Sequence, residues 1–242
     1  MHSPVPKLIP AEVLLLAYRS GVFPMADSRE DDEVFWVEPR RRAILPLDGF
    51  HCSRSLAKVL KQDRFRVTVD ADFGAVMDAC AQPRPDPEAG GESGTWISHT
   101  IAASYLNLHR HGHAHSVECW QDGELVGGLY GVAFERVFCG ESMFSRADNA
   151  SKVALAWLVA LLKRAGFVLL DCQFMTGHLA SMGAVEISRD QYQQMLARAC
   201  DKAPFSSLPQ AHAALLQASS ASGEAASSSP GKLIAQSFTQ TS

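Results

Sequence analysis

The alternation of apolar and polar positions predicts short, mixed elements in the first third of the chain. Residues 11–20 have a helical period, with Pro10 at a favourable first position and Gly21 as a stop. Ser53 is suited to cap a second helix that ends near residue 62. The other elements expected here are strands over residues 34–37 and 65–69 and a helix over residues 72–81.

From residue 96 onward the pattern changes to longer elements. The dipeptide Asp122-Gly123 predicts a tight hairpin, because both residues tolerate a positive φ. A helix capped by Asn149 or Ser151 and stopped by Gly166 is apolar on almost every side, so it is expected to be buried. The predicted elements are helices over residues 98–110 and 152–165 and strands over residues 114–121, 125–133, 137–139 and 167–170.

These elements predict an α+β fold divided into four parts. Residues 1–82 form a small N-terminal domain, and residues 83–95 form a Pro/Gly-rich loop. Residues 96–203 form a larger domain whose central sheet is mixed, mostly antiparallel and flanked by helices. Residues 204–242 are rich in Ser and Ala and bury too little apolar surface to offset the entropy of ordering. A disordered tail is therefore expected there, with at most a short helix near residues 209–218.

Composition places the chain among globular proteins. Hydrophobic residues make up 47% of it and charged residues 20%, and no apolar run reaches the roughly 18 residues that a membrane helix needs. The first 20 residues lack a basic region followed by an apolar core and a small-residue cleavage site, so we expect a cytoplasmic protein. The six cysteines include no C-x-x-C pair, which argues against a disulfide framework or a zinc knuckle.

Three polar residues stand where burial makes them costly. Asp171 and Gln173 follow an apolar strand and share one side of an extended chain. Glu141 follows another apolar strand, within a long polar loop expected over residues 140–152. A carboxylate at the end of a buried strand needs a partner or a purpose. The alternative is that Asp171 caps the next turn and Glu141 makes a surface ion pair.

Several common catalytic motifs are absent from the sequence. Residues 140–144 lack the closing glycine of the serine-hydrolase elbow, and residues 127–131 do not match G-x-G-x-x-G. With no Gly-Lys-Ser/Thr phosphate loop either, nucleotide hydrolysis and dinucleotide redox chemistry are not expected. Four histidines recur at every second residue, but no nearby Cys or carboxylate completes a metal site, so a structural or surface role is favoured. They are His109, His111, His113 and His115.

Charge is unevenly distributed, although the whole chain carries −4. Residues 40–66 hold eight cations and two acids, a local charge of +6. On the predicted helix, Arg54, Lys58 and Lys61 lie on one face. This is either a solvated basic face or a footprint for nucleic-acid phosphates. The phosphate-binding candidates are Arg40, Arg41, Arg42, Arg54, Lys58 and Lys61.

These residues fall within motifs by which the sequence resembles the leucyl/phenylalanyl-tRNA–protein transferase family. The most specific motifs are GESMFSRADNASK at residues 140–152 and DCQF at residues 171–174. The resemblance covers about residues 8–200. Met25 departs from the family, which often has Trp at that position. Further matching motifs are AYRSGVFPM (17–25), HCSRSL (51–56), GTWIS (94–98), HGHAHSVE (111–118), ELVGGLYGV (124–132) and HLASMGA (178–184).

The resemblance implies an enzyme that moves Leu or Phe, with Met as a further candidate, from aminoacyl-tRNA to a protein α-amino group. The implied acceptors begin with Arg or Lys and are thereby marked for N-terminus-dependent degradation. The larger domain would resemble N-acyltransferases of the acetyltransferase type. The basic stretch 40–66 would meet the tRNA phosphates, because the glycine-rich loop for coenzyme A is missing. We expect a monomer without cofactor, metal or membrane partner.

The resemblance also implies roles for single residues. Because the donor ester is already activated, positioning and transition-state stabilisation are expected to matter more than a covalent intermediate. Asp171 is expected to orient the Gln173 amide, which holds the attacking amine or the developing tetrahedral oxygen. Glu141 is expected to accept the Arg or Lys cation of the acceptor. Trp96 and Tyr105 are candidates for contacting the terminal adenosine. The positions implied for an apolar substrate pocket, each of which could equally be core, are Leu129, Phe138, Leu155, Leu158, Leu162 and Leu170.

Two other classes of function fit parts of the pattern. A peptidoglycan-type aminoacyltransferase or an acetyltransferase would share the fold but use a different amine or acyl donor. A non-catalytic tRNA-binding protein could keep the basic face and Trp96, but it has little reason to keep Asp171 and Gln173 together. Turnover compared with simple tRNA retention separates these classes.

Overall fold

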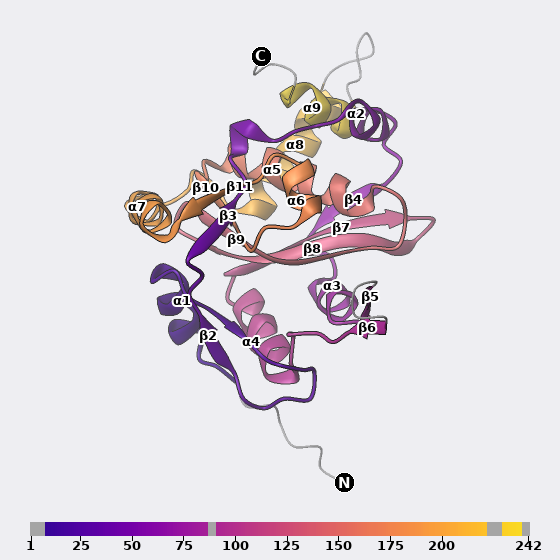
Figure 1. Cartoon of the computed structure of the whole chain (residues 1–242). Coiled ribbons are helices and arrows are strands. Elements are labelled where there is room, and N and C mark those ends of the chain that lie inside the picture. Colours follow the sequence, from indigo (N-terminus) through magenta and orange to yellow (C-terminus); the bar gives the residue numbers. More distant parts are fainter. Residues whose placement is uncertain (1–7, 87–90, 222–228, 239–242) are drawn as a thin grey trace.

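A seven-stranded mixed sheet forms the centre of the protein (Figure 1). The computed structural model describes residues 8–86, 91–221 and 229–238. In this sheet β9 and β10 are parallel to each other, and every other neighbouring pair is antiparallel. In order across the sheet, the strands are β11 (Val185–Ser188), β3 (Arg41–Ile44), β10 (Leu169–Gln173), β9 (Val137–Ser145), β8 (Glu124–Phe134), β7 (Ala114–Gln121) and β4 (Arg66–Val69).

Helices cover both faces of this sheet and enclose one hydrophobic core on each side (Figure 1). On one face the helices are α5 (Ala150–Ala165), α2 (Arg54–Lys61), α6 (Gly177–Ser181), α8 (Leu208–Ala221) and α9 (Pro230–Ser237). The core of the other face includes α1 (Ala11–Arg19), α3 (Phe73–Cys80), α4 (His99–Arg110) and α7 (Arg189–Cys200). Smaller elements are the ribbon of β1 (Phe23–Met25) with β2 (Phe35–Val37), the ribbon of β5 (Arg84–Asp86) with β6 (Gly91–Ser93), and the short helix η1 (Leu47–Gly49).

The long helix α5 confirms the prediction from its apolar sequence, since 13 of its 16 residues are buried. Gly166 ends it in the left-handed conformation, with φ of 82°. At its start Asn149 is the N-cap residue but makes no hydrogen bond through its side chain, so neither predicted side-chain cap forms. The helix lies so close to β8 that a side chain at Gly127 would collide with Ala150.

Most predicted elements are present, and the largest differences lie at the ends of two strands. β9 continues to Ser145, so the polar loop predicted from residue 140 begins only after Ser145. β10 begins at Leu169 and includes both Asp171 and Gln173, which were expected to follow the strand. Glu141 and Ser142 of β9 and Gln173 of β10 line a cavity at this end of the two strands, which explains why the sequence there looks like a loop.

The predicted domain boundary at residue 82 does not separate two sheets. β3 and β4 both come from the first 82 residues, and both are strands of the central sheet. Part of the stretch predicted as a Pro/Gly-rich loop forms the β5–β6 ribbon, while residues 87–90 lie outside the described residues.

The C-terminal segment predicted to be disordered contains two helices. α8 confirms the short helix predicted near residues 209–218, whereas α9 was not predicted. Leu208, Ala211 and Leu215 of α8 recur at helical spacing and are buried against the core, as are Ile234 and Ala235 of α9. The apolar residues of this segment are few, and its Ser/Ala-rich composition hides the fact that they recur at helical spacing. Residues 222–228 and 239–242 lie outside the described residues.

Two features of the described chain bear on the compositional expectations. All six cysteines are free thiols. Among the described helices, none has both the length and the apolar character that crossing a membrane requires.

Candidate active site

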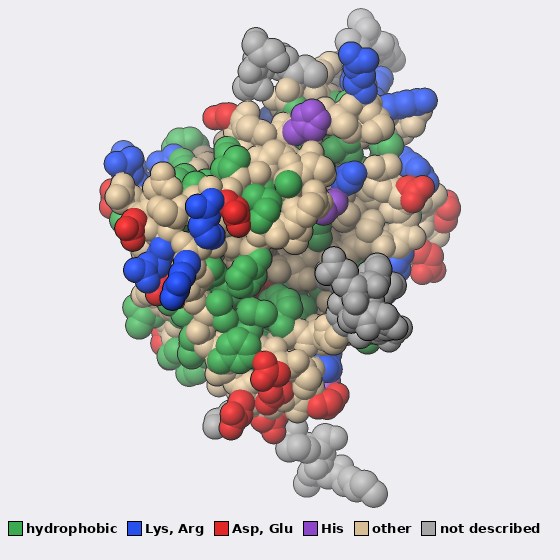
Figure 2. Space-filling model, viewed as in Figure 1, with side chains coloured by type: hydrophobic (Ala, Val, Ile, Leu, Met, Phe, Trp, Pro, Cys, Tyr) green, Lys and Arg blue, Asp and Glu red, His purple; other side chains and the backbone are tan. Residues whose placement is uncertain are grey.

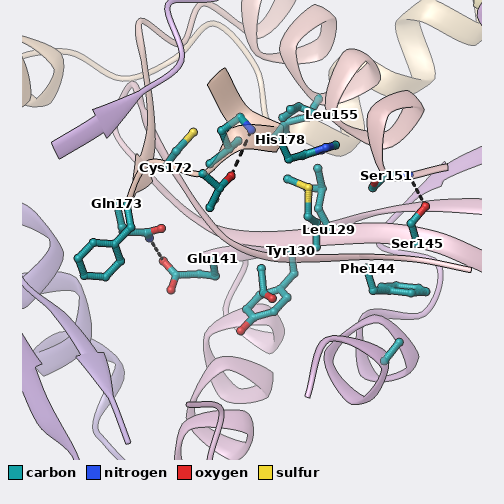
Figure 3. A pocket seen from close by; sticks show the side chains of 18 of the residues that line it. Leu129, Tyr130, Glu141, Phe144, Ser145, Ser151, Leu155, Cys172, Gln173 and His178 are labelled. Atoms are coloured by element: carbon teal, nitrogen blue, oxygen red, sulfur yellow. Dashed lines mark hydrogen bonds between the residues drawn. The ribbon is translucent and has the colours of Figure 1, made fainter. Parts of the chain in front are cut away.

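Glu141 and Gln173 emerge beside each other from the parallel pair of strands in the central sheet. β9 and β10 pair as far as Cys139 opposite Asp171, so the next alternate positions along the two strands are Glu141 and Gln173. Each strand is bulged here, because the pairing of β9 with β8 skips Glu141 and the pairing of β10 with β3 skips Cys172. Bulges of this kind re-aim side chains next to active sites. Here both side chains line the same cavity (Figure 3).

A hydrogen bond joins these two side chains. Nε2 of Gln173 donates to Oε1 of Glu141 at 2.9 Å (Figure 3), and the hydroxyl of Tyr105 donates to Oε2 at 3.1 Å. Tyr105 in turn shares a hydrogen bond with the hydroxyl of Tyr18. Burial raises the pKa of Glu141 to about 7; the hydroxyls of Tyr18 and Tyr105 oppose this rise, and the charge of Asp171 adds to it. Glu141 therefore changes charge near neutral pH.

Asp171 is fully buried, and its partners differ from the prediction. Its Oδ1 accepts from Nε of Arg42 at 2.8 Å and from the backbone N–H of Gln173 at 3.0 Å. Its Oδ2 accepts from Nη2 of Arg42 at 2.5 Å and from the hydroxyl of Tyr192 at 3.0 Å. Asp171 was expected to orient the Gln173 amide directly, but it bonds the backbone of Gln173, and Glu141 holds the amide.

Arg42 does not lie on the surface, so the prediction that it contacts tRNA phosphates is wrong. Its side chain is only 2% exposed and forms the buried ion pair with Asp171. Arg41 is exposed at the start of β3, whereas Arg42, on the opposite face of the strand, lies within the sheet where the remaining residues of β3 are all buried. In the sequence both belong to one basic stretch, residues 40–66.

The cavity beside Glu141 and Gln173 has a volume of about 730 Å³, within the usual range for small-molecule sites. Its apolar wall comes mainly from β8, β9 and the buried side of α5 (Figure 3). The predicted substrate residues that line it are Trp96, Leu129, Leu155, Leu158 and Leu170.

Three predicted substrate residues do not line this cavity. Tyr105 is completely buried and donates its hydroxyl to Glu141, so its ring is not available to stack on an adenine. Phe138 and Leu162 are completely buried in the core on the α5 side of the sheet. Phe138 and Leu162 illustrate the alternative that apolar positions in these motifs are ordinary core.

Several lining residues were missed by the sequence analysis. Met143 and Phe144 belong to the part of β9 that was expected to be a loop, and Met143 is two residues beyond Glu141. That spacing would have identified Met143 had the strand been extended, whereas Phe144 is out of phase with Glu141. His178 lies on the cavity wall at helix α6, where burial lowers its pKa (Figure 3). It belongs to the HLASMGA motif, for which no residue role was expected.

The remaining basic candidates lie on the surface. Arg40, Arg41, Arg54, Lys58 and Lys61 are all exposed, and Arg41 lies 3.6 Å from Glu186. On α2, within the described part of the chain, no carboxylate comes within ion-pair distance of its three cations. In the view of Figure 2, Lys and Arg side chains lie at the top of the molecule, where Figure 1 places α2. Asp and Glu side chains gather at the bottom.

Two of the alternating histidines, His109 and His115, lie beside Asp70, at 3.9 Å and 2.7 Å between Nδ1 and a carboxylate oxygen. His115 binds Asp70, with Nδ1 at 2.7 Å from Oδ2, and His109 places Nδ1 at 2.9 Å from the carbonyl oxygen of Ala114. The ring of His109 also stacks on Phe73, with centroids 4.4 Å apart. Within the described ranges, no three potential metal-ligand side chains come together.

Comparison with known proteins identifies relatives over nearly the whole chain. A family model described as leucyl/phenylalanyl-tRNA protein transferase matches residues 44–197, and the model of the N-terminal domain of that family matches residues 9–40. A leucyl/phenylalanyl-tRNA–protein transferase from Novosphingobium aromaticivorans is 56% identical over 98% of both chains. One from Zymomonas mobilis subsp. mobilis is 60% identical over 78% of this chain and 69% of the relative.

Solved structures give a weaker likeness. L-PGS from Bacillus licheniformis is 15% identical, with a TM-score of 0.38, over 70% of this chain and 55% of that chain. A functionally unknown conserved protein from Staphylococcus epidermidis is 11% identical, with a TM-score of 0.39, over 77% of this chain and 67% of that chain.

The 56% identity over 98% of both chains to the Novosphingobium aromaticivorans relative shows that the protein is an enzyme that transfers aminoacyl groups. The two family models meet at residues 40–44, where β3 begins, rather than at the predicted boundary of residue 82. The chain belongs to the leucyl/phenylalanyl-tRNA protein transferase family, and its activity is the transfer of Leu or Phe from aminoacyl-tRNA to protein. The alternative of a non-catalytic tRNA-binding protein is thereby set aside.

Proposed function

We propose that the acceptors are proteins with N-terminal Arg or Lys, and that their α-amino group attacks the aminoacyl ester beside Gln173. The observation that carries the proposal is the 2.9 Å hydrogen bond between Gln173 and Glu141 on the wall of an apolar cavity. A polar pair at the edge of an apolar site can hold an amine next to the carbonyl of a Leu or Phe ester.

Gln173 holds the attacking amine. Its Nε2 donates one of its two hydrogens to Glu141, which orients the amide, and its Oε1 can accept a hydrogen bond from an N–H of the acceptor amine. The second hydrogen on Nε2 can donate to the developing tetrahedral oxygen. The pKa of an α-amine is about 7.7 to 8.0, so an appreciable fraction is neutral at pH 7 and needs positioning more than activation.

Glu141 holds the cationic side chain of the acceptor. Its two carboxylate oxygens accept from Gln173 and Tyr105, and a carboxylate has about four acceptor sites, so capacity remains for a guanidinium or an ammonium. A bound cation favours the ionised carboxylate and so lowers the raised pKa of Glu141. Arg and Lys are favoured over neutral residues for this reason.

The donor fills the rest of the site. Leu129, Leu155, Leu158 and Leu170 surround the transferred Leu or Phe side chain, and Trp96 contacts the terminal adenosine by stacking. The tRNA phosphates lie along the exposed cations, which are Arg40, Arg41, Arg54, Lys58 and Lys61. Met is a further donor side chain that the same apolar wall would accept.

The wider setting follows from the same proposal. The sheet and α5 form an N-acyltransferase-like fold, a view supported by a single parallel strand pair beside the site. The enzyme acts in the cytoplasm as a monomer, and its products enter N-terminus-dependent degradation.

A transfer assay tests the acceptor class. Phe-tRNA or Leu-tRNA is incubated with matched peptides that begin with Arg, Lys or Ala, and with an N-acetylated Arg peptide as the blocked control. Product is expected from the Arg and Lys peptides and none from the blocked one. Equal transfer to the Ala peptide would overturn the proposed acceptor specificity while leaving the transferase activity intact.

A further inference from the structure

The buried side chains of Arg42, Tyr192 and Asp171 form a support for Gln173. We propose that Arg42 and Tyr192 are positioning residues of the transfer reaction: together they fix Asp171, and Asp171 fixes the backbone of Gln173 so that its amide points at Glu141. This inference rests on the proposed role of Gln173 and deepens it.

Arg42 is itself held on all sides. Its Nε and Nη2 grip both oxygens of Asp171, and its Nη1 donates to the carbonyl oxygen of Gly21 at 3.0 Å. The guanidinium lies between two rings, with its central carbon 4.8 Å from the centroid of Phe23 and 4.4 Å from that of Tyr192. A planar fork with this set of partners cannot be replaced by the single ammonium of Lys.

The conformation of Gln173 shows what this support accomplishes. Gln173 has φ of +53°, in the left-handed region that side chains other than glycine rarely adopt. Its backbone N–H donates to Oδ1 of Asp171, which is the oxygen that Nε of Arg42 also grips. A strained backbone conformation at a functional position persists only where several surrounding contacts hold it in place. The four donors on Asp171 supply that constraint.

The support joins distant parts of the chain. Arg42 comes from β3, Tyr192 from α7, and Phe23 from β1, whereas Asp171 and Gln173 come from β10. Neither Arg42 nor Tyr192 lines the cavity. Changes in Arg42 should therefore alter the rate of transfer and leave the binding of both substrates almost unchanged.

The test is a double-mutant cycle on turnover. Arg42→Lys is compared with the wild type, and Arg42→Lys/Gln173→Ala is compared with Gln173→Ala, at saturating Phe-tRNA and Arg peptide. Arg198→Lys, at an exposed position on α7 outside the proposed site, is the matched control. Because Arg42→Lys could also reduce folding, Tyr192→Phe is measured in parallel, and thermal unfolding is recorded for every variant. This change removes a hydroxyl that donates to Asp171 at 3.0 Å and accepts from Nη2 of Arg42 at 3.4 Å.

Arg42→Lys is expected to lower kcat at least tenfold with less than a twofold change in either KM, and Tyr192→Phe to lower kcat several-fold. In the Gln173→Ala background each change should cost less than twofold. Equal losses in both backgrounds, or near-wild-type kcat for both variants, would overturn the positioning role. Near-wild-type turnover of Gln173→Ala alone would instead overturn the proposed function of Gln173.

Discussion

Gln173 and Glu141 are 32 residues apart in sequence, yet the amide of one donates to the carboxylate of the other at 2.9 Å. The contact exists because β9 and β10 run in the same direction and each is bulged at this level. The pair combines an oriented amide with a carboxyl group that changes charge near neutral pH. It therefore provides the two polar functions that the proposed reaction needs next to an apolar cavity.

Replacement of Gln173 tests its contact with the amine. Gln173→Ala is expected to lower kcat by roughly 10²-fold, the scale on which enzymes lose rate when one positioned polar group is removed. Single-turnover measurements with preformed Phe-tRNA provide the rate. Gln236→Ala, an exposed amide on α9, is the control and should leave the rate unchanged. A Gln173→Ala rate within twofold of the wild type would remove this residue from the mechanism.

The raised pKa of Glu141 predicts a pH dependence of acceptor use. Ionised Glu141 attracts the acceptor cation, so kcat/KM for an Arg peptide should rise as the pH passes through about 7. In Glu141→Gln this step should vanish, leaving the rise from the α-amine near pH 7.7 to 8.0. Profiles from pH 5.5 to 9 are compared with Arg and Ala peptides. Equal loss of transfer to both peptides in Glu141→Gln would contradict the cation-binding role.

The same group predicts a pH dependence of stability. Its pKa of about 7 in the folded protein exceeds the ordinary value of 4.5, so folding favours the protonated form. The contribution of this group to the free energy of unfolding is fully present below pH 4.5 and is lost as the pH rises through about 7, which lowers that free energy by on the order of 3 kcal/mol. Urea unfolding at pH 5 and 8 should therefore show a smaller decline for Glu141→Gln than for the wild type. An unchanged decline would show that Glu141 titrates normally.

Two leucines of α5 provide a matched test of the apolar cavity. Leu158 lines the cavity, whereas Leu162, one turn further along, is buried in the core away from it. Truncation of either to Ala should destabilise the protein by about 2 to 5 kcal/mol. Only Leu158→Ala should change the ratio of Phe to Leu transfer, by about tenfold, as expected when a pocket is altered by a few methylene groups. The ratio is measured with both charged tRNAs at a temperature where both variants are folded.

Charge reversal on α2 tests the proposed tRNA surface. Lys58→Glu/Lys61→Glu should weaken tRNA binding and flatten the dependence of log Kd on log salt concentration by about 1.4 to 1.8. The control is Arg198→Glu/Lys202→Glu, which changes the net charge equally at exposed positions on and after α7. Binding is measured by filter retention between 50 and 200 mM salt. A parallel salt dependence for both double variants would argue that only net charge matters.

Local patterns predicted the elements well and their spatial partners poorly. The helix α5 and the Asp122-Gly123 hairpin depend on residues that are close together in the sequence, so both could be predicted from it. Whether Arg42 points outward depends on the phase of β3 within the sheet, and the partner of Gln173 depends on two bulges that no local pattern indicates. The formation of α9 in a Ser/Ala-rich segment likewise depends on contacts with a distant core.

The bulges in β9 and β10 also bear on whether the enzyme tolerates insertions and deletions as well as substitutions. Substitutions on the apolar wall alter size but leave every side chain in its place. An insertion or deletion of one residue between Leu169 and Gln173 would instead reverse the facing of each residue after it, moving the Cys172 thiol into the position of a carboxylate or an amide. Among descendants of this chain, variation in the length of this short segment should therefore be far rarer than variation in its composition.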